Sequence, residues 1–559
     1  MNNIKNKLTY ALAVVLLMFA AQGCKDDLLD TKPYGVLAEG VSSAGTVDKL
    51  VVAAYAGLGQ HFFGNAETFA GPVSNWVMDV RSDDAYKGGG GITDRTDIHQ
   101  LETATLDPTN YAAHQKWRNG LFAIARTNLA IREIIKLDDP QYPKEIRIAE
   151  MRLLRAFFHF ELKRNFNQIP YLLEETDPLE ASNTEHSSEE LYDMIEEDLQ
   201  FAYDKLPNSQ SDIGRVNKYV AAALLSKLYI ETQQWDKALV KLDFVMSGPY
   251  GLEQEFGSLS TLEVQNGPEA VFTIQFSTAN NYANHNWGNL LNVTASPGID
   301  AGGYANGDDF YHGSQNLVNA FRTGSDGLPL FETFNNEDVL TGDYSGPLDP
   351  RVDFTVGRIG IPWKGTALYA ENWIRSQEYY PGFSGKKHLV APDDPNIHNS
   401  FPWAASGLNF MIIRYAEVLL WKAEALIESN QDLDLARELI NQVRLRAKNS
   451  TYVQTLDDSG DAANYVIEPY PDDNWNQDFA REALRFERRL ELAMEGHRFF
   501  DLVRWNKAAT VMNQYYQTEA EKVQYLEGAV FVAGKHEYLP VPQVEIDLAP
   551  SLYTQNPNY

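Results

Sequence analysis

Residues 216 to 246 read VNKYVAAALLSKLYIETQQWDKALVKLDFVM, a pattern that fits two amphipathic helices joined by a polar turn. In the first half, Val220, Leu224 and Leu228 recur at helical spacing, and the pattern begins again at Trp235. Helices this short are marginal alone in water, so each must bury its apolar face against other helices. The sequence therefore predicts a helical hairpin.

The same hairpin pattern recurs further along the chain. The Trp-x-Lys-Ala-Leu segment at 235–239 resembles the second half of a tetratricopeptide repeat. Apolar residues at helical spacing predict further helices at 47–60, 111–137, 145–166, 188–205 and 479–505, and a second hairpin at 410–446. Together these segments predict a mainly α fold built from paired helices.

Composition limits the class of protein. The chain has 559 residues, 44% of them hydrophobic, which is enough for a large buried core. Lys and Arg total 47 against 77 Asp and Glu, giving a net charge of -30. Such an acidic chain is a poor partner for nucleic acid or for an anionic membrane surface.

The N-terminus has the pattern of a lipoprotein signal. Lys5 and Lys7 precede an apolar run from Leu8 to Ala21, which is too short to span a bilayer, and small residues then lead to Cys24. Cys24 is the only cysteine, so it forms no internal disulfide, and we predict that it carries lipid. We expect a signal peptide at 1–23 and an acylated tether at 24–40.

Two segments lack helical periodicity. Residues 71–110 contain four consecutive glycines, which no helix tolerates, and residues 248–405 are rich in Gly, Pro, Asn and aromatics, with short runs such as 270–276 that predict strands. A span this long without regular elements is usually functional. We therefore expect three parts within one unit: a helical part at 41–247, a loop-rich part at 248–405, and a C-terminal helical part with its tail at 406–559.

Charged residues follow each other at intervals of three near the C-terminus. Glu495, Arg498, Asp501 and Arg504 predict ion pairs on adjacent turns of a helix, and we interpret them as structural. His159 lies among apolar positions without a second His or Cys at metal spacing, which favours a core histidine.

Motifs along the whole chain resemble the SusD/RagB family of outer-membrane nutrient-binding lipoproteins of Bacteroidota. The resemblance lies in Cys-x-x-x-Leu-Leu-Asp after the signal, Trp117 with Asn128, the segment 155–170, Asp-Pro-Arg at 349–351, Arg-Tyr-Ala-Glu-Val-Leu-Leu at 414–420, residues 491–505, Leu-Pro-Val-Pro at 539–542 and Gln-Asn-Pro at 555–557. It implies a SusD-like fold with four tetratricopeptide-like hairpins and a loop-rich insertion with short strands.

The same resemblance implies a function and a location. Family members are not enzymes; they lie on the outer membrane, where they help a SusC-like TonB-dependent transporter capture oligosaccharides, or in some branches peptides, for import. The Lys25, Asp26 and Asp27 run after Cys24 resembles the export signal that places such lipoproteins at the cell exterior. The implied partners are thus the transporter, a glycan and, through the lipid anchor, the membrane.

A sugar site needs flat aromatic surfaces with carboxylate, amide or guanidinium groups around them. Both irregular segments contain these groups. The candidate ligand-binding residues are Trp76, Asp79, Arg81, Asp83, Asp84, Tyr86, Trp287, Tyr304, Trp363, Trp373, Arg375, Tyr379 and Tyr380. The alternative is that these aromatics close the core of the loops or face the transporter.

The sequence does not exclude two other functions. An all-helical glycoside hydrolase would need a pair of carboxylates, which 77 acidic residues could supply, although no separate catalytic motif is present. A scaffold that binds only a protein partner would use the helical hairpins alone. We expect no cofactor, and no acidic run fits the spacing of a calcium loop.

Overall fold

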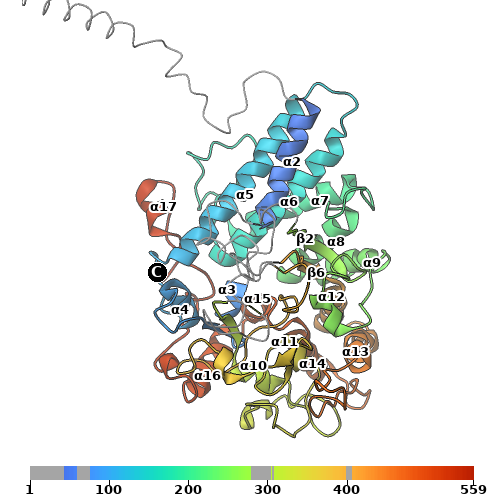
Figure 1. Ribbon diagram of the computed structural model, residues 1–559. Coiled ribbons are helices and arrows are strands. Elements are labelled where there is room, and N and C mark those ends of the chain that lie inside the picture. Colours follow the sequence, from blue (N-terminus) through green and yellow to red (C-terminus); the bar gives the residue numbers. More distant parts are fainter. Residues whose placement is uncertain (1–42, 60–75, 279–303, 305–306, 398–405) are drawn as a thin grey trace, which may run out of the picture. The chain divides into compact units, whose positions relative to one another are not determined.

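The computed structural model describes residues 43–59, 76–278, 304, 307–397 and 406–559 (Figure 1). The chain divides into two units, Met1–Ser43 and Ala44–Tyr559, and all the helices and strands described belong to the second. The predicted signal peptide, Cys24 and Trp287 lie outside the described residues, and for Trp76 only the backbone is described.

The hairpin predicted at 216–246 is present as α8 (Lys218–Glu231) and α9 (Trp235–Met246). The side chain of Asn217 caps α8 by accepting hydrogen bonds from the first N–H groups of the helix. Every residue of α8 from Val220 to Ile230 is buried, more than the predicted apolar stripe requires. The helix is buried all round because α7, α9 and α12 pack against it.

Four helix pairs stack on one another. They are α2 (Ala44–Gly59) with α5 (Tyr111–Lys136), α6 (Lys144–Phe166) with α7 (Ser188–Lys205), α8 with α9, and α12 (Tyr415–Glu428) with α13 (Leu433–Asn449). Contacts of α5 with α6, α7 with α8 and α9 with α12 join the pairs (Figure 1). The mainly α fold with four hairpins is therefore confirmed.

Within the described residues, the named strands form three antiparallel ribbons of two strands each. They pair β1 (Ala85–Gly88) with β3 (Phe310–Gly313), β2 (Ala270–Ile274) with β6 (Phe410–Arg414), and β4 (Pro362–Trp363) with β5 (Ala367–Leu368). Two expectations need correction. The helix predicted from residue 410 begins at Tyr415, since the preceding residues pair with β2, and Tyr86, expected on or beside a loop, lies in β1.

The helix predicted over 479–505 is two helices. These are α14 (Gln477–Leu492) and α15 (Arg498–Arg504), and the chain between them turns through left-handed conformations at Met494 and Gly496. Glu495 therefore lies in a turn and pairs with Arg414, on another element. Of the predicted ladder, only the pair of Asp501 with Arg504, at 2.8 Å, follows the helix.

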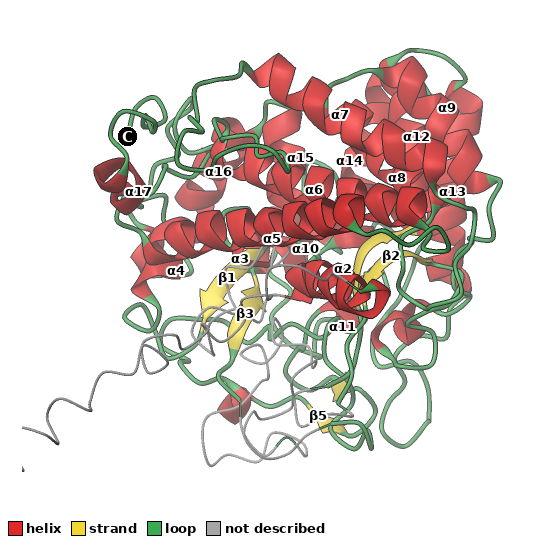
Figure 2. Cartoon of the chain, turned by 90° about the horizontal axis from the view of Figure 1, so that it is seen from above, coloured by secondary structure: helices red, strands yellow, loops and turns green. Residues whose placement is uncertain are grey.

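Where the structure describes it, the loop-rich part contains only short elements. In Figure 2 the stacked helices lie together on one side, and β1, β3 and β5 lie among the loops on the other.

The remaining helices are α3 (Trp76–Asp79), α4 (Thr96–Glu102), α10 (Gln315–Ala320), α11 (Val352–Thr355), α16 (Ala508–Glu519) and α17 (Gln543–Leu548). Among the described helices, none combines the length and apolar character that crossing a membrane would require.

The proline-rich tail packs over the helices, as expected. The Leu539 N–H donates to the Asn165 carbonyl at 2.7 Å, and the Asn556 amide donates to the carbonyls of Phe166 and Leu539, each at 2.8 Å. The Leu539 backbone N–H and the Asn556 side chain thus satisfy two carbonyl groups at the end of α6.

Candidate functional site

Asp79 lies in the interior instead of on an exposed loop. Its Oδ2 accepts hydrogen bonds from the Tyr311 hydroxyl at 2.5 Å and from the Gly496 N–H at 2.7 Å. Burial raises the pKa of the Asp79 carboxyl to about 8, so the folded protein keeps it protonated at neutral pH. This neutral acid connects α3, β3 and the turn before α15.

Asp83 and Asp84 are also buried, and both pair with arginines of the C-terminal helices. Asp83 pairs with Arg498, and Arg489 donates from Nε to Asp84 at 2.7 Å. Burial alone would raise the pKa of Asp83, but the positive charges of Arg489 and Arg498 lower it to about 2. These carboxylates hold the segment after α3 against α14 and α15.

Arg81 and Tyr86 complete this buried set. Arg81 donates from Nη2 to the His536 carbonyl at 2.5 Å, and its guanidinium carbon lies 4.0 Å from the centre of the Phe499 ring. The Tyr86 hydroxyl donates to Glu519. Residues 79–86 are buried, which corrects the expectation that they line an open loop, although Asp83 lines a pocket together with Arg489 and Arg498.

Three of the predicted aromatics form a small core of their own. Trp363 is fully buried and stacks on Tyr369, with ring centres 5.4 Å apart, while Trp373 meets Trp363 edge-on at 6.2 Å. The Tyr304 hydroxyl donates to the Val390 carbonyl at 2.5 Å. These side chains were expected to be exposed; they close the core of the loops instead, as the alternative interpretation held.

Two predicted residues, Arg375 and Tyr379, remain partly exposed. The Arg375 guanidinium lies 3.2 Å from a carboxylate oxygen of Asp94 and 3.4 Å from one of Asp308. The side chains of Arg375, Asp94 and Asp308 are 26%, 31% and 28% exposed, and Tyr379 is half-buried. We call these four residues the Arg375 cluster.

The glycine run forms the floor of the Arg375 cluster. A Cβ at Gly90 would lie 3.2 Å from the Arg375 guanidinium, and one at Gly91 would lie 2.9 Å from the Tyr379 ring. Gly91 also has a backbone φ of 92°, which residues other than glycine rarely adopt. Glycine is therefore needed where the loop passes beneath the arginine and the tyrosine.

Lys87 holds this loop in place. Its ammonium group donates to the carbonyl oxygens of Gly88, Gly91 and Asp94, at 2.7, 2.9 and 2.7 Å. The Gly90 N–H donates to the Asp94 carboxylate at 2.9 Å, which fixes the side chain that faces Arg375. The Arg375 cluster is thus preorganised by backbone contacts.

Tyr380 lies beneath Tyr379 and is buried. Its ring centre is 6.3 Å from that of Tyr379 and 6.3 Å from that of Tyr86. Tyr380 therefore supports the half-buried Tyr379 ring instead of offering a surface itself. The structure thus brings residues 88–94 of the first irregular segment together with residues 375–379 of the second. Trp363 and Trp373 lie apart from them, in their own core.

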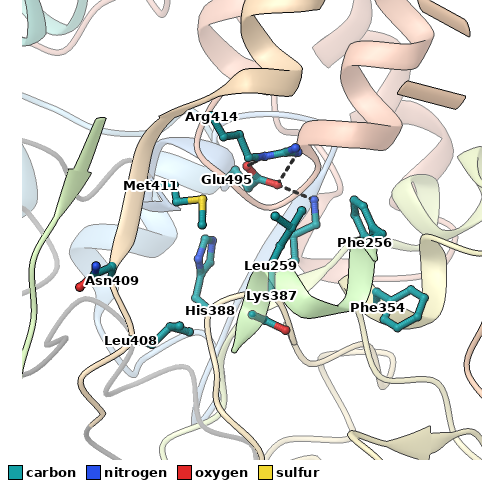
Figure 3. Close-up of a pocket in the computed structure, with 11 residues that line it drawn as sticks. Phe256, Leu259, Phe354, Lys387, His388, Leu408, Asn409, Met411, Arg414 and Glu495 are labelled. Atoms are coloured by element: carbon teal, nitrogen blue, oxygen red, sulfur yellow. Dashed lines mark hydrogen bonds and ion pairs between the residues drawn. The ribbon is translucent and has the colours of Figure 1, made fainter. Parts of the chain in front are cut away.

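The cavity in Figure 3 is too small for a sugar. It lies between Phe256, Phe354, His388 and Met411, and its volume of about 40 Å³ suits a few water molecules. On one side Glu495 accepts hydrogen bonds from Lys387 at 2.7 Å and Arg414 at 2.8 Å (Figure 3). Burial would raise the pKa of Glu495, but these two cations hold it well below its usual range.

Neither Asp94 nor Asp308 was a predicted ligand residue. Asp94 follows the glycine run, and Asp308 precedes β3, so more than 200 positions separate them and no local spacing connects them. Within the described residues, no group of three or more His, Cys, Asp or Glu side chains is arranged to hold a metal ion.

Comparison with known families identifies the chain. A model described as "SusD family" matches residues 268–559, and one described as "Starch-binding associating with outer membrane" matches residues 27–230. The protein belongs to the SusD family. The SusD-like protein P2 of Formosa agariphila is 24% identical, over 98% of this chain and 99% of its own length. A SusD-like protein of Bacteroides ovatus is 25% identical, over 98% and 94%.

Solved SusD-like structures have the same fold. A laminarin-binding SusD-like protein superposes with a TM-score of 0.65 at 23% identity, over 92% of this chain and 99% of that one. Surface glycan-binding protein A from Bacteroides thetaiotaomicron, solved in complex with laminarihexaose, superposes with a TM-score of 0.68 at 21% identity, over 92% and 99%. At these identities the comparison establishes the fold.

Proposed function

We propose that this SusD-family protein is a cell-surface lipoprotein that captures an oligosaccharide or polysaccharide and passes it to a SusC-like TonB-dependent transporter for import. The observation that carries the proposal is the Arg375 cluster, in which Arg375 pairs with two carboxylates above Gly90 and the half-buried Tyr379 ring lies above the next residue, Gly91. A sugar ring has an apolar C–H face and a polar edge, and this arrangement offers a partner to each.

The comparisons support a glycan as the ligand. One structural relative is named for binding laminarin, and another was solved with laminarihexaose. The description of the model that matches residues 27–230 associates starch binding with the outer membrane. For this chain we propose the same class of ligand, with Arg375 and Tyr379 as contact residues, Asp94 and Asp308 as hydrogen-bond acceptors, and Trp76 and Trp287 as further contacts.

We further propose that lipid on Cys24 anchors the protein to the outer membrane, facing the cell exterior, after cleavage of residues 1–23. Lipid chains contribute roughly 0.8 kcal/mol per buried methylene, so several chains anchor a protein stably. Residues 24–40 would then be the tether, followed by the helical part at 41–247, the loop-rich part at 248–405 and the C-terminal part at 406–559. Globomycin should leave the precursor uncleaved, and labelling with a palmitate analogue should be lost in C24A.

Calorimetric titration of residues 24–559 with soluble glycans, laminarihexaose among them, tests the binding proposal. We expect saturable binding, with the glycan recovered unchanged after prolonged incubation. Release of shorter sugars would support the glycoside hydrolase instead. Binding of a peptide digest, with no heat from any glycan, would support the peptide-binding RagB-type function and overturn ours.

A further inference from the structure

A second pocket, lined by lysines, lies beside the cavity of Figure 3. Ser260 and Phe354 line both. The pocket lies between the 3-10 helix Phe256–Ser260, the hairpin of β4 and β5, and the loop at 453–458, and its volume is about 410 Å³. That volume is within the range of small-ligand sites and is large enough for a sugar ring.

Lys364 is presented to this pocket by a tight turn. It lies at the tip of the β4–β5 hairpin in a left-handed conformation (φ 47°), followed by Gly365 (φ 76°), and the Thr366 N–H closes the turn onto the Trp363 carbonyl at 3.0 Å. The buried Trp363 ring anchors the hairpin in the aromatic core. The Lys364 ammonium donates to the Ser260 hydroxyl at 3.1 Å.

Lys386 supplies a second cation to the lining. Its side chain is buried, and its ammonium donates to the carbonyl oxygens of Asp353 and Pro362, at 2.5 and 3.2 Å. Burial lowers the pKa of Lys386 to about 8; burial and then the charge of Lys386 lower that of Lys364 to about 7. Placing two ammonium groups near one another costs free energy that an anion would offset.

Carboxylates offset these charges only in part: the charge of Asp353 raises the pKa of Lys386 against the larger effect of burial, but the Asp353 carboxylate pairs with Arg358. Among the described residues, no carboxylate oxygen lies within 4 Å of either ammonium group, although Asp458 lines the pocket from the exposed loop. In a chain with 77 acidic and 47 basic residues, a lysine such as Lys364, whose pKa responds to burial and to a second lysine, is unexpected in a pocket. The remaining polar lining includes Thr261, Gln454 and Thr455.

We propose that this lysine pocket binds the acid group, a carboxylate or a sulfate ester, of an acidic sugar unit. The Lys364 ammonium would contact the acid oxygens, with the Ser260 hydroxyl as a second donor, and the neutral side chains of Thr261 and Gln454 would face sugar hydroxyls. The proposal rests on the proposed function and assigns the glycan to the acidic class.

The test compares three probes on the native protein and on K364Q. The probes are an oligogalacturonide, which has carboxylates, a carrageenan oligosaccharide, which has sulfate esters, and neutral laminarihexaose. We expect K364Q to weaken binding of one acidic probe about tenfold, as for one charge-assisted hydrogen bond, without changing binding of the neutral probe. The acidic probe that loses affinity identifies the acid group.

The matched control is K136Q, which removes the same charge from an exposed site on α5, where Lys136 is 66% exposed. It should leave binding of all three probes unchanged. Lys364 is half-buried, so K364Q should keep the native unfolding temperature to within a few degrees. Equal affinity of native protein and K364Q for both acidic probes would overturn the acidic-ligand proposal alone. Failure of every glycan to bind would overturn the proposed function with it.

Discussion

Arg498 donates two parallel hydrogen bonds to Asp83, from Nε at 2.8 Å and from Nη2 at 2.9 Å, although 415 positions separate the two residues. Bidentate pairs of this kind are the strongest that arginine forms with a carboxylate. Arg489 lies 3.2 Å from the same carboxylate, so one buried anion serves two cations. The pairing joins the segment after α3 to α14 and α15.

Removing the charge of Asp83 should strongly destabilise the fold. In D83N the guanidinium groups of Arg489 and Arg498 would stay buried beside a neutral amide, and we expect the free energy of unfolding to fall by about 3 to 5 kcal/mol. Urea denaturation followed by circular dichroism measures it. D193N, on the exposed face of α7, is the control and should change it by less than about 0.5 kcal/mol. Equal stability of the two variants would contradict the role assigned to Asp83.

Asp79 should make the free energy of unfolding fall as the pH rises. Burial raises the pKa of this carboxyl from 3.8 to about 8, so the folded state holds a proton that the unfolded state releases. Its contribution to stability is fully present below pH 3.8 and is lost as pH rises through about 8. At 1.36 kcal/mol per pH unit, the loss between pH 5 and 8 is up to about 4 kcal/mol.

The variant D79N isolates this effect. Its carboxamide oxygen can accept from Tyr311 and Gly496 as the protonated acid does, but it cannot ionise. We expect the stability of D79N to fall less between pH 5 and 8 than that of the native protein, measured by urea denaturation at each pH. Parallel curves for the two proteins would show that Asp79 has an ordinary pKa.

The paired helices could be predicted from the sequence because their signal is local. Val220, Leu224 and Leu228 recur at the helical period, and this pattern needs no knowledge of the partner helix. The break between α14 and α15 has no such signal, because it depends on a left-handed Met494, a conformation unusual for that residue. Helical periodicity alone therefore continued one helix through the turn.

The candidate site was predicted only in part, for a related reason. Loops rich in charge and aromatics look alike whether they face solvent or the interior, and the partners that bury Asp83 and Tyr86 come from α14, α15 and α16. Arg375 and Tyr379 were among the predicted ligand residues. Asp94, which pairs with Arg375, was not predicted because it comes from a different segment of the chain. Contacts between segments so far apart in sequence leave no spacing pattern to read.

Glycine 91 should be required for the shape of the Arg375 cluster. In G91A the new Cβ would lie 2.9 Å from the Tyr379 ring and the residue would keep an unfavourable φ of 92°. We expect the ring to shift and affinity for the bound glycan to fall severalfold, measured by calorimetry. G251A is the control, since a Cβ at Gly251 meets nothing within 4 Å. An unchanged affinity in G91A would show that the ligand does not contact this ring.

The Tyr379 ring should be the aromatic surface on which a sugar rests. It is half-buried, and the buried Tyr380 ring supports it from beneath at 6.3 Å between centres. Y379A removes the apolar surface and leaves Arg375 in place, so we expect a loss of about 1 to 2 kcal/mol in binding free energy, measured by calorimetry. Y111A removes a tyrosine that is 43% exposed at the start of α5 and should bind like the native protein. If both variants bound the glycan equally well, the sugar would have to lie elsewhere, because a ring that stacks on a ligand cannot be removed without loss of affinity.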